Sequence, residues 1–206
     1  MSEFDIKAND WDKNNVNLER AREIANQLLE IVPFRPEMKV MEFGAGTALL
    51  SFMLKDLFTS ITLIDNSREM IRICNEKIAQ TKSAHIKAIK IDLETEYFED
   101  KFDVIYSQMA FHHVSDIGKI VHKLHHLLKE GGMLAIADLY PEDGSFHGEG
   151  FTGHLGFDPE WLSELLNQSG FENVTFNECF VQKQINSDGK QKEYPIFLMI
   201  ASKISE

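Results

Sequence analysis

Residues 40–48, Val-Met-Glu-Phe-Gly-Ala-Gly-Thr-Ala, carry the pattern with the clearest chemical meaning in this chain of 206 residues. An apolar stretch ends in Glu42, and Gly44 and Gly46 follow before the next apolar stretch. Glycine permits a tight turn and lets the backbone approach a ligand closely. A helix that begins after the turn has N–H groups without partners, which bind negative charge or lone pairs. The pattern therefore predicts a site for a nucleotide-like cofactor.

Acidic residues end three successive apolar segments, at Glu42, Asp65 and Asp92. If these segments are parallel strands, the acids meet at the carboxyl edge of the sheet, where such sheets bind ligands. Three carboxylates suit a ligand with ribose hydroxyls, amino groups and little negative charge. An adenosine that carries a sulfonium fits this description, whereas a pyrophosphate would be repelled.

Two other nucleotide sites fit the glycine pattern less well. A dinucleotide fingerprint needs glycine at the sixth position counted from Gly44, and that position is Leu49. No Lys-Ser or Lys-Thr pair follows the turn, which excludes a P-loop.

His112 and His113 follow the fourth apolar segment and are candidates for proton transfer. Imidazole has an unperturbed pKa suited to a general base near neutral pH. The alternative is that both rings pack or bond to a loop backbone. His122 and His126 lie one helical turn apart, as metal ligands can, but they fall on the expected wet face of their helix among lysines. No metal is predicted.

The elements that must position these residues alternate along the chain. Apolar segments typical of strands lie at 39–43, 61–65, 86–92, 103–107 and 133–139, and amphipathic segments typical of helices at 47–58, 67–80, 116–129 and 158–169. A first helix is expected from Asn17, its N-cap, to the prolines at 33 and 36. Segments 173–183 and 195–204 flank a polar turn at Asp188-Gly189, which predicts a hairpin. The pattern predicts an α/β fold, a Rossmann-like doubly wound, mostly parallel seven-stranded sheet with a C-terminal antiparallel hairpin and helices on both faces.

A glycine-rich segment at 144–156 follows the fifth strand, on the expected ligand side of the sheet. Glycines alternate there with aromatic and polar residues, including Phe146, His147 and His154. We interpret the segment as a lid whose three named side chains bind the substrate. The alternative is an ordinary flexible connection.

The composition limits the class of protein. A formal charge of −12 argues against binding to a nucleic-acid backbone, which needs clustered Lys and Arg. The two cysteines, Cys74 and Cys179, lack metal spacing and are expected to be reduced thiols. No apolar run approaches the length of a membrane span, and residues 1–7 lack the pattern of a signal peptide. These features predict a cytoplasmic protein that binds neither nucleic acid nor membranes, and they leave the oligomeric state undefined.

Five motifs in order resemble those of class I S-adenosylmethionine-dependent methyltransferases of the small-molecule type. They are Glu42-x-Gly44-x-Gly46, the acid Asp65, the segment 91–93, the segment 103–108 with its continuation 110–114, and 127–132. One departure is Ala48, where many members have a third glycine. The resemblance covers nearly all of the chain from residue 10 onward.

The resemblance implies S-adenosyl-L-methionine as cofactor, S-adenosyl-L-homocysteine as product and a small-molecule acceptor that is methylated on O or N. It implies His112 and His113 as catalytic residues, with His112 the better candidate. The implied cofactor-binding residues are Trp11, Glu42, Gly44, Ala45, Gly46, Thr47, Asp65, Asn66, Met70, Asp92, Leu93, Ser107 and Gln108. Trp11 would cover the cofactor, or else anchor the N-terminal segment.

We expect one domain over 1–206, with an N-terminal cap segment and helix (1–36), a cofactor-binding core (37–140), the lid-like loop (141–157) and a C-terminal helix and hairpin (158–206). Two other functions stay open. One is a relative that binds the cofactor or a partner without turnover, and the other is a dinucleotide-dependent oxidoreductase.

Overall fold

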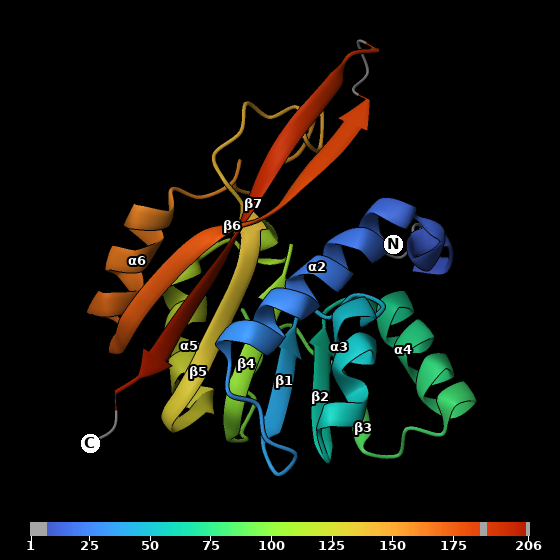
Figure 1. The fold of residues 1–206 in the computed structure, drawn as a ribbon, viewed down its shortest axis with the longest axis vertical. Helices are drawn as coiled ribbons and strands as arrows, with labels where there is room; N and C mark the ends of the chain where they lie inside the picture. Colours follow the sequence, from blue (N-terminus) through green and yellow to red (C-terminus); the bar gives the residue numbers. More distant parts are fainter. Residues whose placement is uncertain (1–7, 186–188, 205–206) are drawn as a thin grey trace.

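The structure, a computed structural model, describes residues 8–185 and 189–204. Its centre is one seven-stranded sheet with the order β3-β2-β1-β4-β5-β7-β6 (Figure 1). The strands are β1 (Lys39–Phe43), β2 (Ser60–Asp65), β3 (Ile86–Lys90), β4 (Phe102–Gln108), β5 (Leu128–Leu139), β6 (Phe171–Ile185) and β7 (Gln191–Lys203). The first five strands are parallel, and β7 runs antiparallel to both β5 and β6. The predicted Rossmann-like architecture is confirmed.

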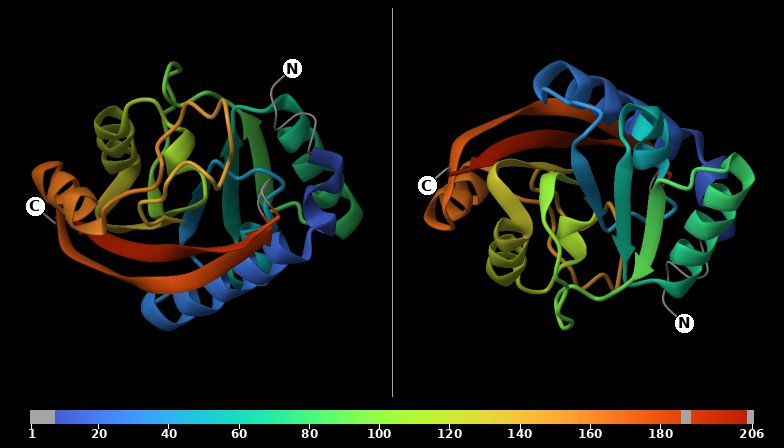
Figure 2. Two further views of the ribbon diagram at one scale, coloured as in Figure 1. Left: turned by 90° about the horizontal axis from the view of Figure 1, so that it is seen from above. Right: turned by 90° about the horizontal axis from the view of Figure 1, so that it is seen from below.

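Helices cover both faces of the sheet (Figure 2). They are η1 (Ala8–Lys13), α2 (Asn15–Ile31), α3 (Leu49–Leu54), η2 (Lys55–Leu57), α4 (Arg68–Thr81), η3 (Phe111–His113), α5 (Ile117–Leu127) and α6 (Pro159–Gln168). One apolar core joins the sheet to α2 and α3 through residues such as Leu28 and Leu50. A second core joins the other face to α5 and α6 through residues such as Leu124 and Leu162.

Several predicted boundaries are wrong by a few residues. The N-cap of α2 is Asn14, whose side chain accepts a hydrogen bond from the Val16 amide, while Asn17 lies in the first turn. Helix α3 begins at Leu49 because Ala48 has a left-handed φ of 61° and still belongs to the turn. Helix α5 ends at Leu127, earlier than expected, because Leu128 is already buried in the sheet opposite Phe102.

The long C-terminal hairpin extends past the carboxyl ends of the parallel strands (Figure 1). Both strands of the hairpin are longer than predicted, and Ile185 of β6 pairs with Gln191 of β7 at the far end. Asp188 of the predicted turn lies outside the described residues.

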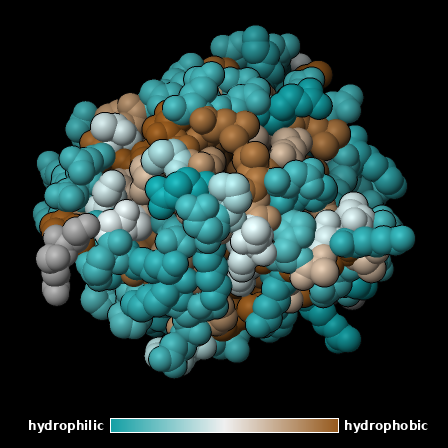
Figure 3. All heavy atoms as spheres, turned by 60° about the horizontal axis from the view of Figure 1, so that its bottom comes forward, coloured by the Kyte–Doolittle hydropathy of each residue, from teal (hydrophilic) through white to brown (hydrophobic). Residues whose placement is uncertain are grey.

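The surface is mixed in character. Hydrophilic side chains cover most of the face in Figure 3, with apolar side chains in patches between them. Large exposed apolar residues come from separate elements, for example Leu29, Met53 and Trp161. Among the described residues, no helix combines the length and the apolar character that crossing a bilayer requires.

Candidate active site

A cavity of about 650 Å³ opens at the carboxyl ends of β1, β2 and β4. The strand order reverses between β1 and β4, and ligands of open α/β sheets bind at such a switch point. The volume lies in the range of small-molecule sites. The glycine turn, the N-terminal segment, the two adjacent histidines, the loop after β5 and strand β6 all contribute to its lining.

The two glycines of the turn are needed for different reasons. Gly44 has a φ of 64°, and a Cβ placed there would lie 2.4 Å from the Cβ of Ala110. Gly46 also has a positive φ, but a Cβ there would meet nothing within 4 Å. Because Gly46 lines the cavity, its missing side chain leaves space that a ligand can fill against the backbone.

Asp65 joins the end of β2 to the glycine turn. Its Oδ2 accepts a hydrogen bond of 2.8 Å from the Gly46 amide, and its Oδ1 accepts one of the same length from the Ser67 amide. Asp92 is held by the Glu94 amide and the Thr95 hydroxyl. Both acids line the cavity, each with carboxylate oxygens that can accept further hydrogen bonds.

Glu42 is placed differently from the other two acids. It is fully buried, does not line the cavity, and accepts a hydrogen bond from the Ser51 amide beneath the turn. Its Oε1 has no hydrogen-bond partner within the described part of the chain. Burial disfavours the charged carboxylate and raises the pKa of Glu42 to about 8, although the bonds from Ser51 oppose this shift. Of the three acids expected to converge on one ligand, Asp65 and Asp92 therefore line the cavity and Glu42 does not.

Most of the other predicted cofactor residues line the cavity. They are Trp11, Gly44, Ala45, Gly46, Asn66, Met70, Leu93 and Gln108. Thr47 and Ser107 are buried and lie behind the lining. The Ser107 hydroxyl donates to the Phe43 carbonyl, and the Thr47 hydroxyl donates to Asp12. These two residues hold the turn in place.

Polar contacts tie the N-terminal segment to the glycine turn. Asp12 accepts hydrogen bonds from the Thr47 hydroxyl at 2.5 Å and from Lys77 Nζ at 2.9 Å. Lys77 also donates to the Thr47 carbonyl at 2.7 Å. This arrangement places the neighbouring Trp11 against the cavity.

His112 and Asp138 form a buried pair at the ends of β4 and β5. The Nδ1 of His112 lies 2.6 Å from the Oδ1 of Asp138, and the two side chains are 1% and 0% exposed. Burial alone would raise the pKa of Asp138, but His112 and the Leu139 and His112 amides outweigh it and lower that pKa. An ionised carboxylate only accepts, so Nδ1 carries the hydrogen, and in the neutral form of the ring Nε2 then has the lone pair. This Nε2 is buried and has no hydrogen-bond partner within residues 8–185 and 189–204.

The loop after β5 contributes to the cavity as expected, through Phe146 and His147. His154 lies apart, in a smaller hollow with Phe151, and its amide donates a hydrogen bond of 2.7 Å to the His112 carbonyl. The hairpin supports the loop, because Gln184 donates to the Phe146 carbonyl and Ser145 bonds to Tyr194.

Arg20 is a cavity residue that the sequence analysis missed. It is 5% exposed and donates a hydrogen bond of 2.6 Å to Gln182 on β6, which also lines the cavity. Burial lowers the pKa of Arg20 to about 10, although the charge of Asp138 opposes this. The signal in the sequence that could have identified Arg20 is its position one helical turn before Ile24, on the buried face of α2.

Comparisons with known proteins agree with this geometry. A family model described as a methyltransferase domain matches residues 40–132. An uncharacterized methyltransferase of Schizosaccharomyces pombe is 30% identical over 154 residues, which are 66% of this chain and 54% of the relative. The chain spans about half the length of the curated relatives it matches.

Many solved structures share the fold at low sequence identity, among them two methyltransferases. A SAM-dependent methyltransferase from Aquifex aeolicus has a TM-score of 0.66 and 16% identity, covering 91% of this chain and 98% of that one. Phosphoethanolamine N-methyltransferase 2 of Haemonchus contortus, in complex with S-adenosyl-L-methionine, has a TM-score of 0.72 and 15% identity, covering 100% and 61%. Residues 40–132 thus match the methyltransferase domain family, and the motifs and the fold of the chain are those of class I S-adenosylmethionine-dependent methyltransferases.

Proposed function

We propose that the chain binds S-adenosyl-L-methionine at the glycine turn and transfers its methyl group to an oxygen or nitrogen atom of a small molecule. The observation that carries this proposal is that one cavity is lined both by Gly46 and Asp65 and by His112. In this proposal the cofactor site and a group able to accept a proton therefore share one cavity.

The lining fits the proposed cofactor on chemical grounds. The open space beside Gly46 admits a ligand close to the backbone, and Asp65 and Asp92 offer acceptors for ribose hydroxyls and an amino group. Ile64 and Leu93 offer apolar contacts to the adenine base of the cofactor. In this proposal Trp11 covers the ligand from the N-terminal side, and Glu42 supports the turn from below.

S-adenosylmethionine supplies a methyl group that is already activated by a sulfonium. The protein therefore has chiefly to position the acceptor and exclude water. In the proposed reaction, the acceptor atom would form the new bond to the methyl carbon while the carbon–sulfur bond breaks and leaves its electron pair on sulfur. Nε2 of His112 would take the proton that the acceptor gives up. Asp138 holds the imidazole in the tautomer that this step needs.

The acceptor is proposed to lie against His113, Phe146 and His147, with the loop 141–157 acting as the lid. Arg20 and Gln182 offer donors from α2 and β6 to polar groups of the acceptor. The relative in complex with S-adenosyl-L-methionine is an N-methyltransferase, which supports nitrogen as one of the two acceptor atoms.

Calorimetric titration with S-adenosylmethionine, S-adenosylhomocysteine and NAD tests the cofactor. We expect heat from the first two compounds and none from NAD, whereas binding of NAD alone would favour an oxidoreductase. A metabolite library read out by release of S-adenosylhomocysteine tests catalysis. Cofactor binding without release in the presence of any acceptor class would favour a non-catalytic relative.

A further inference from the structure

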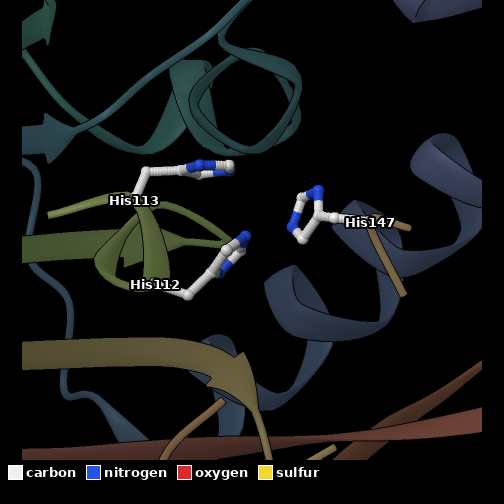
Figure 4. A group of neighbouring side chains, drawn as sticks. All are labelled: His112, His113 and His147. Atoms are coloured by element: carbon white, nitrogen blue, oxygen red, sulfur yellow. The ribbon is translucent and has the colours of Figure 1, made fainter. Parts of the chain in front are cut away.

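We propose that His112, His113 and His147 form a binding site for a divalent transition-metal ion such as Zn²⁺ at the acceptor position of the cavity. One ring nitrogen from each residue lies within 4.8 Å of the other two. The three rings come from η3 and from the loop after β5, and Figure 4 shows them converging on a shared space. We call this set the three-histidine group.

The orientation of His112 is the one that metal-binding histidines adopt. Such residues typically donate one ring N–H to a carboxylate and bind the ion with the other nitrogen. Here Nδ1 contacts Asp138 at 2.6 Å, while Nε2 is buried without a hydrogen-bond partner among the described residues. A buried nitrogen lone pair without a partner is costly unless a ligand uses it.

His147 is held over the other two histidines by its own loop. Its ring stacks on Phe151 at 3.9 Å and lies 5.0 Å from the ring centres of both His112 and His113. A Cβ on Gly153 would lie 2.3 Å from the His112 carbonyl, so a glycine is required where the loop passes η3. The hydrogen bond from the His154 amide to the same carbonyl fixes this approach. The three-histidine group therefore depends on specific contacts between η3 and the loop after β5, which are distant in the sequence.

The donor set selects the kind of ion. Three neutral imidazoles suit Zn²⁺ and neighbouring first-row ions, and three protein ligands leave a coordination position for substrate or water. Zn–N bonds of about 2.0–2.1 Å in a tetrahedral site require nitrogens about 3.3 Å apart. The widest pair must therefore close by at most about 1.5 Å from the present 4.8 Å limit, which side-chain rotation on the loop can supply.

The chemical consequence rests on the proposed function. An ion here would bind the oxygen of a hydroxyl-bearing acceptor and lower the pKa of that hydroxyl, so that its proton leaves to solvent. The oxygen would then form the bond to the methyl carbon, and the electron pair of the broken carbon–sulfur bond would stay on sulfur. With the ion bound, Nε2 of His112 is a ligand, and the ion replaces the histidine as the means of deprotonation.

This site differs from the one weighed in the sequence, where only the histidines of the 116–129 segment were considered. His122 and His126 are exposed on α5, away from the cavity lining. The substitution His122→Ala therefore serves as a matched control, because it also removes one histidine from the chain.

The test is direct metal binding to the whole chain after chelator treatment. We expect one Zn²⁺ per chain by calorimetry, and a visible ligand-field spectrum with Co²⁺. His147→Ala should remove stoichiometric binding and the spectrum, while His122→Ala should retain both. Asp138→Asn should weaken Zn²⁺ binding by about 10–100-fold, as loss of a carboxylate behind a metal-bound histidine does.

Two results would overturn the site. One is a wild-type chain that takes up no stoichiometric ion, and the other is equal binding by wild type and His147→Ala. Far-ultraviolet circular dichroism of each variant shows whether it is folded. Methyl transfer by metal-free protein would support the proposed function and remove the ion's role in it, whereas stoichiometric metal binding without methyl transfer would support the site and count against the proposed function.

Discussion

The glycine turn and the three-histidine group line the same cavity, but they are held together by different kinds of contact. At the turn, neighbouring parallel strands meet, and Asp65 reaches the Gly46 amide from the adjacent strand end. The histidines depend on a loop that crosses back over η3 and is supported by the C-terminal hairpin. A cofactor shared by many enzymes can be bound by the first arrangement, while the second can change with the acceptor.

The largest effect is expected from removing the reactive ring on the acceptor side. His112→Ala should lower turnover by about 10²–10⁴-fold, since the proposed proton transfer and the proposed ion binding both need this ring. Affinity for S-adenosylhomocysteine should change by less than about threefold, because binding and chemistry are then separable. Steady-state kinetics and calorimetry measure the two quantities, with His122→Ala as control. Equal turnover in His112→Ala and wild type would dismiss the catalytic role.

The buried acid beneath the turn should make stability depend on pH. The pKa of Glu42 is about 8 in the folded chain against an ordinary 4.5, so the folded state keeps a proton that the unfolded state releases between these values. Stability contributed by this residue therefore falls as pH rises from 4.5 through 8. Glu42→Gln should be more stable than wild type at pH 9 by on the order of a few kcal/mol and similar at pH 4.

Urea unfolding of both proteins across this pH range measures the difference. The slope of the difference in unfolding free energy against pH shows whether Glu42 keeps its proton in the folded chain. Parallel curves for wild type and Glu42→Gln would mean that the carboxyl is ionised in the folded chain.

Adding a methyl group to the glycine turn should lower both the stability of the chain and its affinity for the cofactor. Gly44→Ala places a Cβ against Ala110 at a positive φ, and the overpacking should cost about 1–3 kcal/mol of unfolding free energy. Calorimetry should show weaker binding of S-adenosylhomocysteine. The double variant Gly44→Ala/Ala110→Gly removes the opposing atom and should recover part of the loss. Unchanged affinity in the single variant would contradict the required close approach.

The smallest effect is expected where the N-terminal segment covers the cavity. Trp11→Ala should weaken cofactor binding by about 1–2 kcal/mol, the usual range for loss of an aromatic contact. Fluorescence or calorimetric titration measures the change. A loss of stability with unchanged cofactor affinity would show that Trp11 is an anchor for the segment rather than a cover.

The two regions also differed in how far the sequence could predict them. Gly44, Gly46 and Asp65 were identified because their roles follow from a short local pattern and a strand end. Glu42 matched the same pattern, but its burial beneath the turn depends on Ser51 and on the packing of α3, which no motif encodes.

The acceptor side depends on contacts between distant residues. His112 and Asp138 are separated by 26 positions, and Arg20 and Gln182 by 162. No spacing rule connects such pairs, so the arginine was missed and His147 was expected only as a substrate contact. The element order was predictable because alternating strands and helices allow few topologies.

The order of the last strands has a consequence for synthesis on the ribosome. Strand β7 lies between β5 and β6, although it follows β6 in the chain (Figure 1). While residues 191–203 are still untranslated or in the exit tunnel, β6 has no neighbour to pair with, and the edge of β5 is open. Gln182 and Gln184 thus reach the cavity only after β7 has been made. A nascent chain could assemble the glycine turn early, whereas the acceptor side must wait for the end of translation of this segment.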